Sequence, residues 1–381
     1  MQNLRGAIMI AFLNILSWIF FVIFAFIAFL VLGMGGRLQF VLILAIALIL
    51  LPPFRYFVKN LAGVEIRWWA FVLVGVILWG GVMLSFILNP AKSIYKSEKY
   101  KSQLLKIYDE KLAQWPVPYE SRYIDTKYGK IHVITSGPQD GYPVFLINAS
   151  GLSGWSWIHN VELLNTKYRT FAIDNVGEGG KNEMIAPGMI PKNGREIADF
   201  YSEISDTLGI EKSHVIGASI GGFIATNYAL HSPEKVDKLV LLGSMGYGTT
   251  LRTIIAMTLA QGFPLKPIQE ATFRWAFGND ETVNQSFGEW FRVYMKGLIP
   301  TPIVPTTFNP EELRNVQVST LAYFGTKDGV IGDVKDAEKL ALNIPNVQIE
   351  IVESGHVIGA ELPELVNPAI LEFFESKIAE K

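Results

Sequence analysis

The stretch HVIGASIGGFIATNYAL, residues 214–230, decides the fold because it joins two kinds of structure within a few residues. Its apolar start is typical of a buried strand, and its second half has the pattern of a helix. Ser219 lies at the join, between Gly217 and Gly221, which predicts a tight strand–turn–helix. Glycine is needed there because a Cβ would meet neighbouring chain. Ser219 is therefore either a nucleophile exposed above a sheet or a small residue in a tight turn.

The rest of the chain from Tyr119 onward alternates short β-rich runs with helical patterns. This alternation predicts an α/β fold with a mainly parallel sheet and helices on both faces. A hairpin is expected over 122–137, turning at Tyr128 and Gly129. Further strands are expected at 143–148, 169–174, 213–218, 238–243, 318–325 and 346–352, and helices at 194–208, 220–231 and 362–378. The long interval 245–316 predicts an inserted helical cap rich in aromatic residues.

The N-terminal part has a different composition. Residues 7–32, 39–53 and 68–88 contain no charged side chain, and a membrane span needs about 20 apolar residues. We therefore expect an all-α transmembrane domain of about three helices over 1–90. Residues 91–118 are expected to form an amphipathic juxtamembrane linker. Either its lysines rest on anionic lipid headgroups, or its apolar stripe packs on the next domain. The remaining domain then spans 119–381.

This organisation predicts a multi-pass location in the cell membrane, with the lipid bilayer as a partner. Basic residues flank the apolar runs too evenly to decide on which side the C-terminal domain lies. A net charge of −2 argues against a nucleic-acid partner. The absence of cysteine excludes structural disulfides and thiol chemistry.

A serine hydroxyl is a poor nucleophile at neutral pH, so a catalytic Ser219 requires a base and an acid that orients the base. His356 lies in the loop ESGHVIGAELPE after a predicted strand, at the sheet edge where ligands bind in open α/β folds. It is the predicted base. The remaining histidines fall in or beside predicted strands and helices and are expected to be structural: His132, His159, His214 and His231.

The predicted acid is Asp328, which comes just past the strand 318–325. Asp333 is the rival, but it lies further into the loop and is expected to start a helix. Two backbone N–H groups should stabilise the oxyanion. We assign them to Ile220, directly after the serine, and to Ser150 in the loop ASGLSGWSW. The sequence implies no metal and no organic cofactor.

Several spaced motifs together resemble the α/β-hydrolase superfamily over roughly 119–381. In chain order they are NASG (148–151), AIDNVGEGGKN (172–182), GASIGG (217–222), GTKDGVI (325–331) and SGHVIGAELPELV (354–366). The resemblance implies Ser219, Asp328 and His356 as a catalytic triad, and a cap over the pocket. Serine at position 219 argues against relatives with an aspartate nucleophile, such as haloalkane dehalogenases and epoxide hydrolases.

The chain departs from this family at two places. Asn148 and Ala149 stand where many relatives have His-Gly, which puts the detail of the oxyanion loop in question. Lys181 and Asn182 replace the usual ending of the glycine-rich segment, which we interpret as structural.

The predicted function is a membrane-anchored serine hydrolase that cleaves carboxylic esters through an acyl-enzyme on Ser219. The aromatic cap and the apolar N-terminus suggest a small-molecule or lipid-like ester as substrate. Acyl transfer, thioester hydrolysis and amide cleavage would use the same residues. A catalytically silent hydrolase fold used for binding or scaffolding is the alternative from another class.

Overall fold

The computed structural model describes residues 15, 17–25, 27–28, 37–50, 60, 73–81, 93–186, 188–248, 253, 266–277, 281–299 and 303–376. The chain separates into two compact units: residues 1–91 with 258–265, and residues 92–257 with 266–381. The first unit contains α2 (Arg37–Leu50), in which Ile43 is buried. The rings of Phe24 and Trp79 meet edge-on there, with centroids 5.8 Å apart.

The second unit is built on one sheet. In the described part of the chain its strands are β1 (Tyr119–Thr126), β2 (Gly129–Ser136), β3 (Tyr142–Ile147), β4 (Tyr168–Ile173), β5 (Glu183–Met184), β6 (Ser213–Ala218), β7 (Val236–Leu242), β8 (Ser319–Gly325) and β9 (Val347–Val352). Their order is β1-β2-β4-β3-β6-β7-β8-β9, with β5 paired to β2. Neighbours from β4 to β9 are parallel, whereas β2 pairs antiparallel with β1, β4 and β5. The predicted hairpin and mainly parallel sheet are confirmed.

Burial along the strands follows their place in the sheet. The central strands β3, β6 and β7 are almost continuously buried, as expected where helices cover both faces of a parallel sheet. The edge strand β1 is mostly exposed, and β9 alternates between half-buried and exposed positions. The long apolar runs in the sequence therefore mark the sheet centre, where the site is built.

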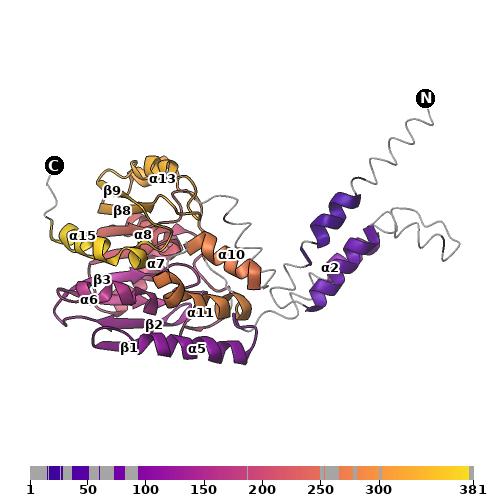
Figure 1. The fold of residues 1–381 in the computed structure, drawn as a ribbon, viewed down its shortest axis with the longest axis horizontal. Coiled ribbons are helices and arrows are strands. Elements are labelled where there is room, and N and C mark those ends of the chain that lie inside the picture. Colours follow the sequence, from indigo (N-terminus) through magenta and orange to yellow (C-terminus); the bar gives the residue numbers. More distant parts are fainter. Residues whose placement is uncertain are drawn as a thin grey trace. The chain divides into compact units, whose positions relative to one another are not determined.

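Helices complete the α/β arrangement (Figure 1). Side chains of α7 (Gly194–Thr207), α8 (Ile220–His231) and α13 (Val334–Ala341) join those of the strands in one large hydrophobic core. The short helix α6 (Val161–Leu164) packs on β4 and on α15 (Pro363–Glu375). The three helices predicted from periodicity are thus present, each ending within a few residues of its expected boundary.

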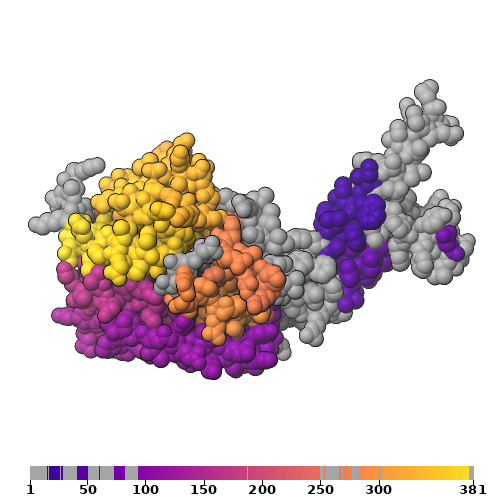
Figure 2. Space-filling view, in the orientation of Figure 1, coloured from indigo at the N-terminus to yellow at the C-terminus, as the bar shows by residue number. Residues whose placement is uncertain are grey.

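The interval between β7 and β8 contains the helices α10 (Lys266–Phe277), α11 (Glu281–Gly297) and α12 (Pro310–Arg314). The orange helices of this interval lie between the purple N-terminal elements of the unit and its yellow C-terminal elements (Figure 2). The rest of the predicted cap, at 249–252, 254–265, 278–280 and 300–302, lies outside the described residues.

Helix α5 (Glu98–Leu112) occupies the predicted linker and packs against α11. Its stripe of Leu104, Ile107, Tyr108 and Leu112 is buried. The Tyr108 hydroxyl donates to Asp174 Oδ1 at 3.0 Å, which ties the helix to the loop after β4. The apolar side of this helix therefore faces protein within the second unit.

The predicted membrane location is wrong, and the predicted bilayer partner is not supported. Among the residues that the structure describes, none of the helices combines the length and the apolar character that crossing a membrane requires. Within the second apolar run, the structure describes α2 over 14 residues, Arg37–Leu50, and residues 51–53 lie outside the described residues. Most of the runs 7–32 and 68–88 lies outside the described residues.

Candidate active site

Ser219 occupies a strained turn between β6 and α8. Its φ is 54° and its ψ is −119°, and it is the one non-glycine residue with positive φ in the described ranges. Such a conformation costs about 1–3 kcal/mol and persists only where its surroundings impose it. The glycines predicted at this turn provide the space: a Cβ on Gly217 would lie 2.3 Å from the Gly221 carbonyl oxygen, and one on Gly221 would lie 2.0 Å from the Ile147 carbonyl oxygen.

Gly221→Ala is expected to destabilise the second unit by about 3 kcal/mol, because the added methyl group meets backbone atoms of β3 that cannot rotate away. Urea unfolding measures the change. The control is Gly80→Ala, where a Cβ would meet nothing within 4 Å and no loss is expected. Equal unfolding midpoints for wild type and Gly221→Ala would contradict this view of the turn.

Ser219, His356 and Asp328 form one hydrogen-bonded chain. Ser219 Oγ lies 2.7 Å from His356 Nε2, and His356 Nδ1 lies 2.7 Å from Asp328 Oδ2. All three residues are at most 5% exposed. Each follows the end of a strand: Ser219 follows β6, Asp328 follows β8 and His356 follows β9, and these strands lie close together in the sheet. In the sequence, His356 is 137 residues from Ser219 and 28 residues from Asp328.

The backbone after β8 fixes the Asp328 carboxylate. Its Oδ1 accepts hydrogen bonds from the amides of Val330 at 2.8 Å and Ile331 at 3.2 Å, which leaves Oδ2 for the histidine. The rival Asp333 is instead the N-cap of α13, where it accepts from the Lys335 amide at 2.9 Å. The two aspartates thus make different contacts: Asp328 meets His356, whereas Asp333 caps α13.

Glu361, which the sequence did not single out, holds the histidine loop. It ends the short helix α14 (Ile358–Glu361) and accepts from the Ser354 hydroxyl at 2.8 Å and the Gly355 amide at 2.6 Å. It also accepts from the Val357 amide at 3.2 Å. The backbone amides of the residues before and after His356 are therefore both bound to one carboxylate. The one sequence signal was an acidic residue in the otherwise apolar segment after His356.

The two predicted oxyanion donors come from two different segments of the fold. Ile220 is the first residue of α8, and Ser150 lies in the loop after β3, which pairs with β6. Among the hydrogen bonds of the described residues, neither backbone N–H has an acceptor. First-turn amides of a helix lack intrahelical acceptors, so the Ile220 amide is free to bind a ligand oxygen.

Glu178 is a second residue that sequence reasoning passed over. It lies in the glycine-rich segment after β4, is 2% exposed, and accepts from the Gly151 amide beside Ser150 at 2.9 Å. Burial raises the pKa of this carboxyl to about 7, against the smaller lowering effect of hydrogen bonds from Ser150 and Gly151. The available signal was a charged residue inside a run of glycines.

The other histidines make structural contacts. His132 is fully buried, with Nδ1 3.1 Å from the Tyr108 hydroxyl and 3.3 Å from Asp174 Oδ2. Burial lowers the pKa of His214 to about 4, and its ring stacks on Phe374. Within the described ranges, no group of three or more His, Asp or Glu side chains is arranged to hold a metal ion.

A cavity of about 30 Å³ adjoins the hydrogen-bonded chain. Its wall includes Ala218 and Val357, the chain neighbours of Ser219 and His356, and is otherwise mainly apolar. The main large side chains in the wall are Leu152, Trp157, Leu242, Phe287 and Ile358. A water-sized probe needs about 10–15 Å³, so this space accommodates a group of a few heavy atoms.

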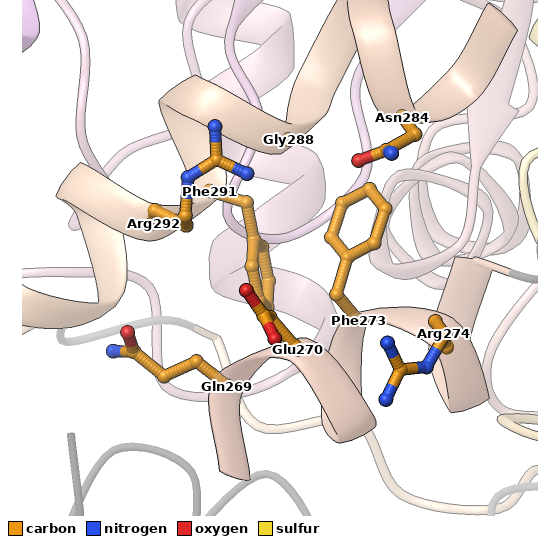
Figure 3. A pocket seen from close by; sticks show the side chains of 8 residues that line it. All are labelled: Gln269, Glu270, Phe273, Arg274, Asn284, Gly288, Phe291 and Arg292. Atoms are coloured by element: carbon orange, nitrogen blue, oxygen red, sulfur yellow. The ribbon is translucent and has the colours of Figure 1, made fainter. Parts of the chain in front are cut away.

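A second cavity, of about 280 Å³, lies between α10 and α11 (Figure 3). It is lined by Arg274, Arg292, Glu270 and Phe291, among others, and not by Ser219, His356 or Asp328. Phe287 and Phe291 thus come from one helix but line different cavities.

Comparison with known proteins agrees with this geometry. The family model of the α/β hydrolase fold matches residues 142–263. Carboxylesterase YbfK of Bacillus subtilis (strain 168) is 28% identical over 279 residues, which cover 70% of this chain and 91% of that protein. The crystal structure of carboxylesterase CesB (YbfK) from Bacillus subtilis has a TM-score of 0.67 at 26% identity, covering 74% of this chain and 100% of that one.

The crystal structure of naproxen esterase (carboxylesterase NP) from Bacillus subtilis has a TM-score of 0.65. Its sequence is 30% identical, and the match covers 71% of this chain and 97% of that chain. This identity extends along nearly the whole length of the relative, and the sheet and the strand–turn–helix described above agree with it. The chain therefore belongs to the α/β-hydrolase family and is an enzyme of the carboxylic ester hydrolase kind.

Proposed function

We propose that the chain is a serine esterase that cleaves small carboxylic esters through an acyl-enzyme on Ser219. The observation that supports this best is the buried chain of two 2.7 Å contacts from Ser219 through His356 to Asp328. The similarity to carboxylesterases of Bacillus subtilis supports the ester as substrate class.

In the first half-reaction, Ser219 Oγ attacks the ester carbonyl carbon while His356 Nε2 takes its proton. Asp328 holds the imidazole by its Nδ1–H and stabilises the imidazolium that forms. The carbonyl oxygen becomes an oxyanion, which the N–H groups of Ile220 and Ser150 bind. The C–O bond to the alcohol then breaks, and the imidazolium returns the proton to the leaving oxygen.

In the second half-reaction, a water molecule attacks the acyl-enzyme while His356 takes one of its protons. The bond between the acyl carbon and Ser219 Oγ breaks, the serine regains a proton, and the carboxylic acid leaves. Two ester-bond cleavages of this type need neither a metal nor an electron carrier.

Acyl-enzyme formation can be tested by mixing the protein with p-nitrophenyl acetate, quenching in acid and mapping the peptide that contains Ser219 by mass spectrometry. We expect p-nitrophenol release and an acetyl adduct on Ser219 alone. Release without an adduct on this peptide, or no release above the buffer rate, would contradict the proposed esterase function.

The small cavity beside Ser219 and His356 supports short acyl groups over long ones. The aromatic cap had suggested lipid-like esters, but neither the cavity of about 30 Å³ nor the carboxylesterase relatives support a lipid substrate. One additional methylene in an apolar pocket changes the transition-state free energy by about 1–3 kcal/mol, which is enough to separate acetate from octanoate esters.

Phe287→Ala is therefore expected to raise the ratio of kcat/KM for p-nitrophenyl octanoate to that for the acetate by about tenfold or more. The truncation enlarges the cavity wall near Ser219. Phe291→Ala is the matched control. It removes the same kind of ring from the same helix, but Phe291 lines the other cavity. An equal rise in both variants would assign the change to loosened packing and contradict the pocket assignment.

A further inference from the structure

Glu178 makes contacts that bear on the proposed oxyanion donor Ser150. Its Oε2 accepts from the Gly151 amide at 2.9 Å, and the Ser150 side chain also bonds to this carboxyl. A buried carboxylate is costly unless its neighbours compensate it, and a neutral acceptor would satisfy one amide at lower cost. The presence of an ionisable group here therefore calls for a role beyond filling a hydrogen bond.

The peptide group between Ala149 and Ser150, which carries the Ser150 N–H, is held by hydrogen bonds to its carbonyl oxygen. The Ala149 carbonyl oxygen accepts from Asn148 Nδ2 at 3.0 Å and from the Leu152 amide at 3.1 Å. In a trans peptide the N–H points away from the carbonyl, so these bonds set the direction of the Ser150 N–H. That direction is kept only if the next peptide, between Ser150 and Gly151, is also fixed.

The cap helix α11 fixes the loop from its other side. Trp290 Nε1 donates to the Gly151 carbonyl oxygen at 2.7 Å. Gly151 has a φ of 73°, and a Cβ there would lie 3.4 Å from the Tyr294 ring. Gly151 therefore has its amide bound to Glu178 and its carbonyl bound to the cap, which leaves Ser150 between two anchored peptides.

We propose that Glu178 is a positioning residue that holds the Ser150–Gly151 loop, so that the Ser150 N–H meets the oxyanion, and that it does so best when ionised. An ionised carboxylate accepts hydrogen bonds that are roughly twice as strong as neutral ones. This inference rests on the proposed esterase function and adds a residue that acts through Ser150.

The surroundings of Glu178 make it the group whose charge changes near neutral pH. The titratable side chains that interact with it are Tyr201 of α7 and Tyr294 of α11, and burial raises the pKa of both further above neutrality. Both phenols stay protonated where Glu178 titrates. Loss of the Glu178 proton as the pH rises through about 7 then strengthens the hold on the loop.

Glu178→Gln tests the inference because it keeps the shape and one acceptor oxygen but cannot ionise. We expect kcat for p-nitrophenyl acetate to fall by about 10-fold to 100-fold with KM nearly unchanged, since a displaced oxyanion donor affects the transition state. Affinity for a trifluoromethyl ketone, which forms an oxyanion on the serine, should fall by a similar factor. A purely structural role for Glu178 would not lower kcat and the ketone affinity while leaving KM nearly unchanged.

The pH profile supplies the second readout. In wild type, kcat should fall as the pH drops through about 7 and Glu178 gains its proton, and this fall should be absent from Glu178→Gln. Glu183→Gln changes an exposed glutamate of β5, five residues further along the chain; it is the control and should match wild type. Ser150→Ala, which removes the hydroxyl bond but keeps the N–H, should give an intermediate loss of kcat.

An unchanged kcat and ketone affinity in folded Glu178→Gln would overturn the inference. So would a higher kcat, which would mean that the negative charge opposes the oxyanion more than it orders the loop. These outcomes leave the esterase proposal standing as long as wild type still acquires the acetyl adduct on Ser219. If that adduct never forms, the esterase proposal itself has failed.

Discussion

His356→Ala is expected to lower the rate of p-nitrophenyl acetate hydrolysis by about a thousandfold or more. The substitution removes the proton acceptor that lies 2.7 Å from Ser219 Oγ, and no other histidine contacts that oxygen among the described residues. A neutral serine hydroxyl then has to attack without a base. Steady-state kinetics at saturating substrate, with thermal unfolding to establish that the variant is folded, measure the effect.

His231→Ala is the matched control for this loss. His231 ends α8, the helix that begins directly after Ser219, and so lies at the opposite end of the same element. Its replacement should leave the rate close to that of wild type. A His356→Ala variant that retains activity within a few-fold of wild type would rule out His356 as the base.

Asp328→Asn should lower kcat by about 10³-fold to 10⁴-fold with little change in fold. Asparagine has the shape of aspartate, and its oxygen can still accept from the Val330 amide, so the loop after β8 is preserved. Its amide, however, donates to His356 Nδ1 and forces the imidazole into the tautomer that cannot take the serine proton. The charge that stabilises the imidazolium is also lost.

Asp333→Asn separates this effect from general loop damage. Asp333 is five residues further along the same loop and caps α13 through the Lys335 amide. Asparagine caps a helix about as well as aspartate, so both stability and kcat should stay near their wild-type values. If the two variants lost activity equally, the assignment of the acid to Asp328 would be wrong.

Much of the fold followed from local sequence patterns. The strands at the sheet centre are near-continuous apolar runs, so β3, β6 and β7 could be located directly. The helices α7, α8 and α15 could be located by their pattern. The short elements β5, α14 and the 3₁₀ helix Gly154–His159 were missed, because two to six residues carry too little pattern to distinguish them from loop.

The candidate site was predictable where chain order and strand ends define it. Ser219, Asp328 and His356 each follow a recognisable strand, and the sheet order brings those strand ends together. Glu178 and Trp290 act through side chains that reach a backbone elsewhere in the fold, whereas the Glu361 side chain folds back on the loop just before it. Single-sequence periodicity carries no information on such contacts.

The membrane prediction failed for a different reason. Hydropathy records that a run is apolar and uncharged, but it does not record whether those residues form one uninterrupted helix of sufficient length. Apolar residues also pack against protein: in α2, Ile43 is buried among neighbouring apolar side chains.

Covalent labelling with a fluorophosphonate tests the central claim most directly, because the reagent requires a serine activated by a base and does not depend on the choice of substrate. We expect labelling of wild type at one site, identified by mass spectrometry as Ser219, with labelling abolished in Ser219→Ala and strongly slowed in His356→Ala. Absence of labelling in folded wild type, or equal labelling of wild type and Ser219→Ala, would contradict the assignment of Ser219 as the nucleophile.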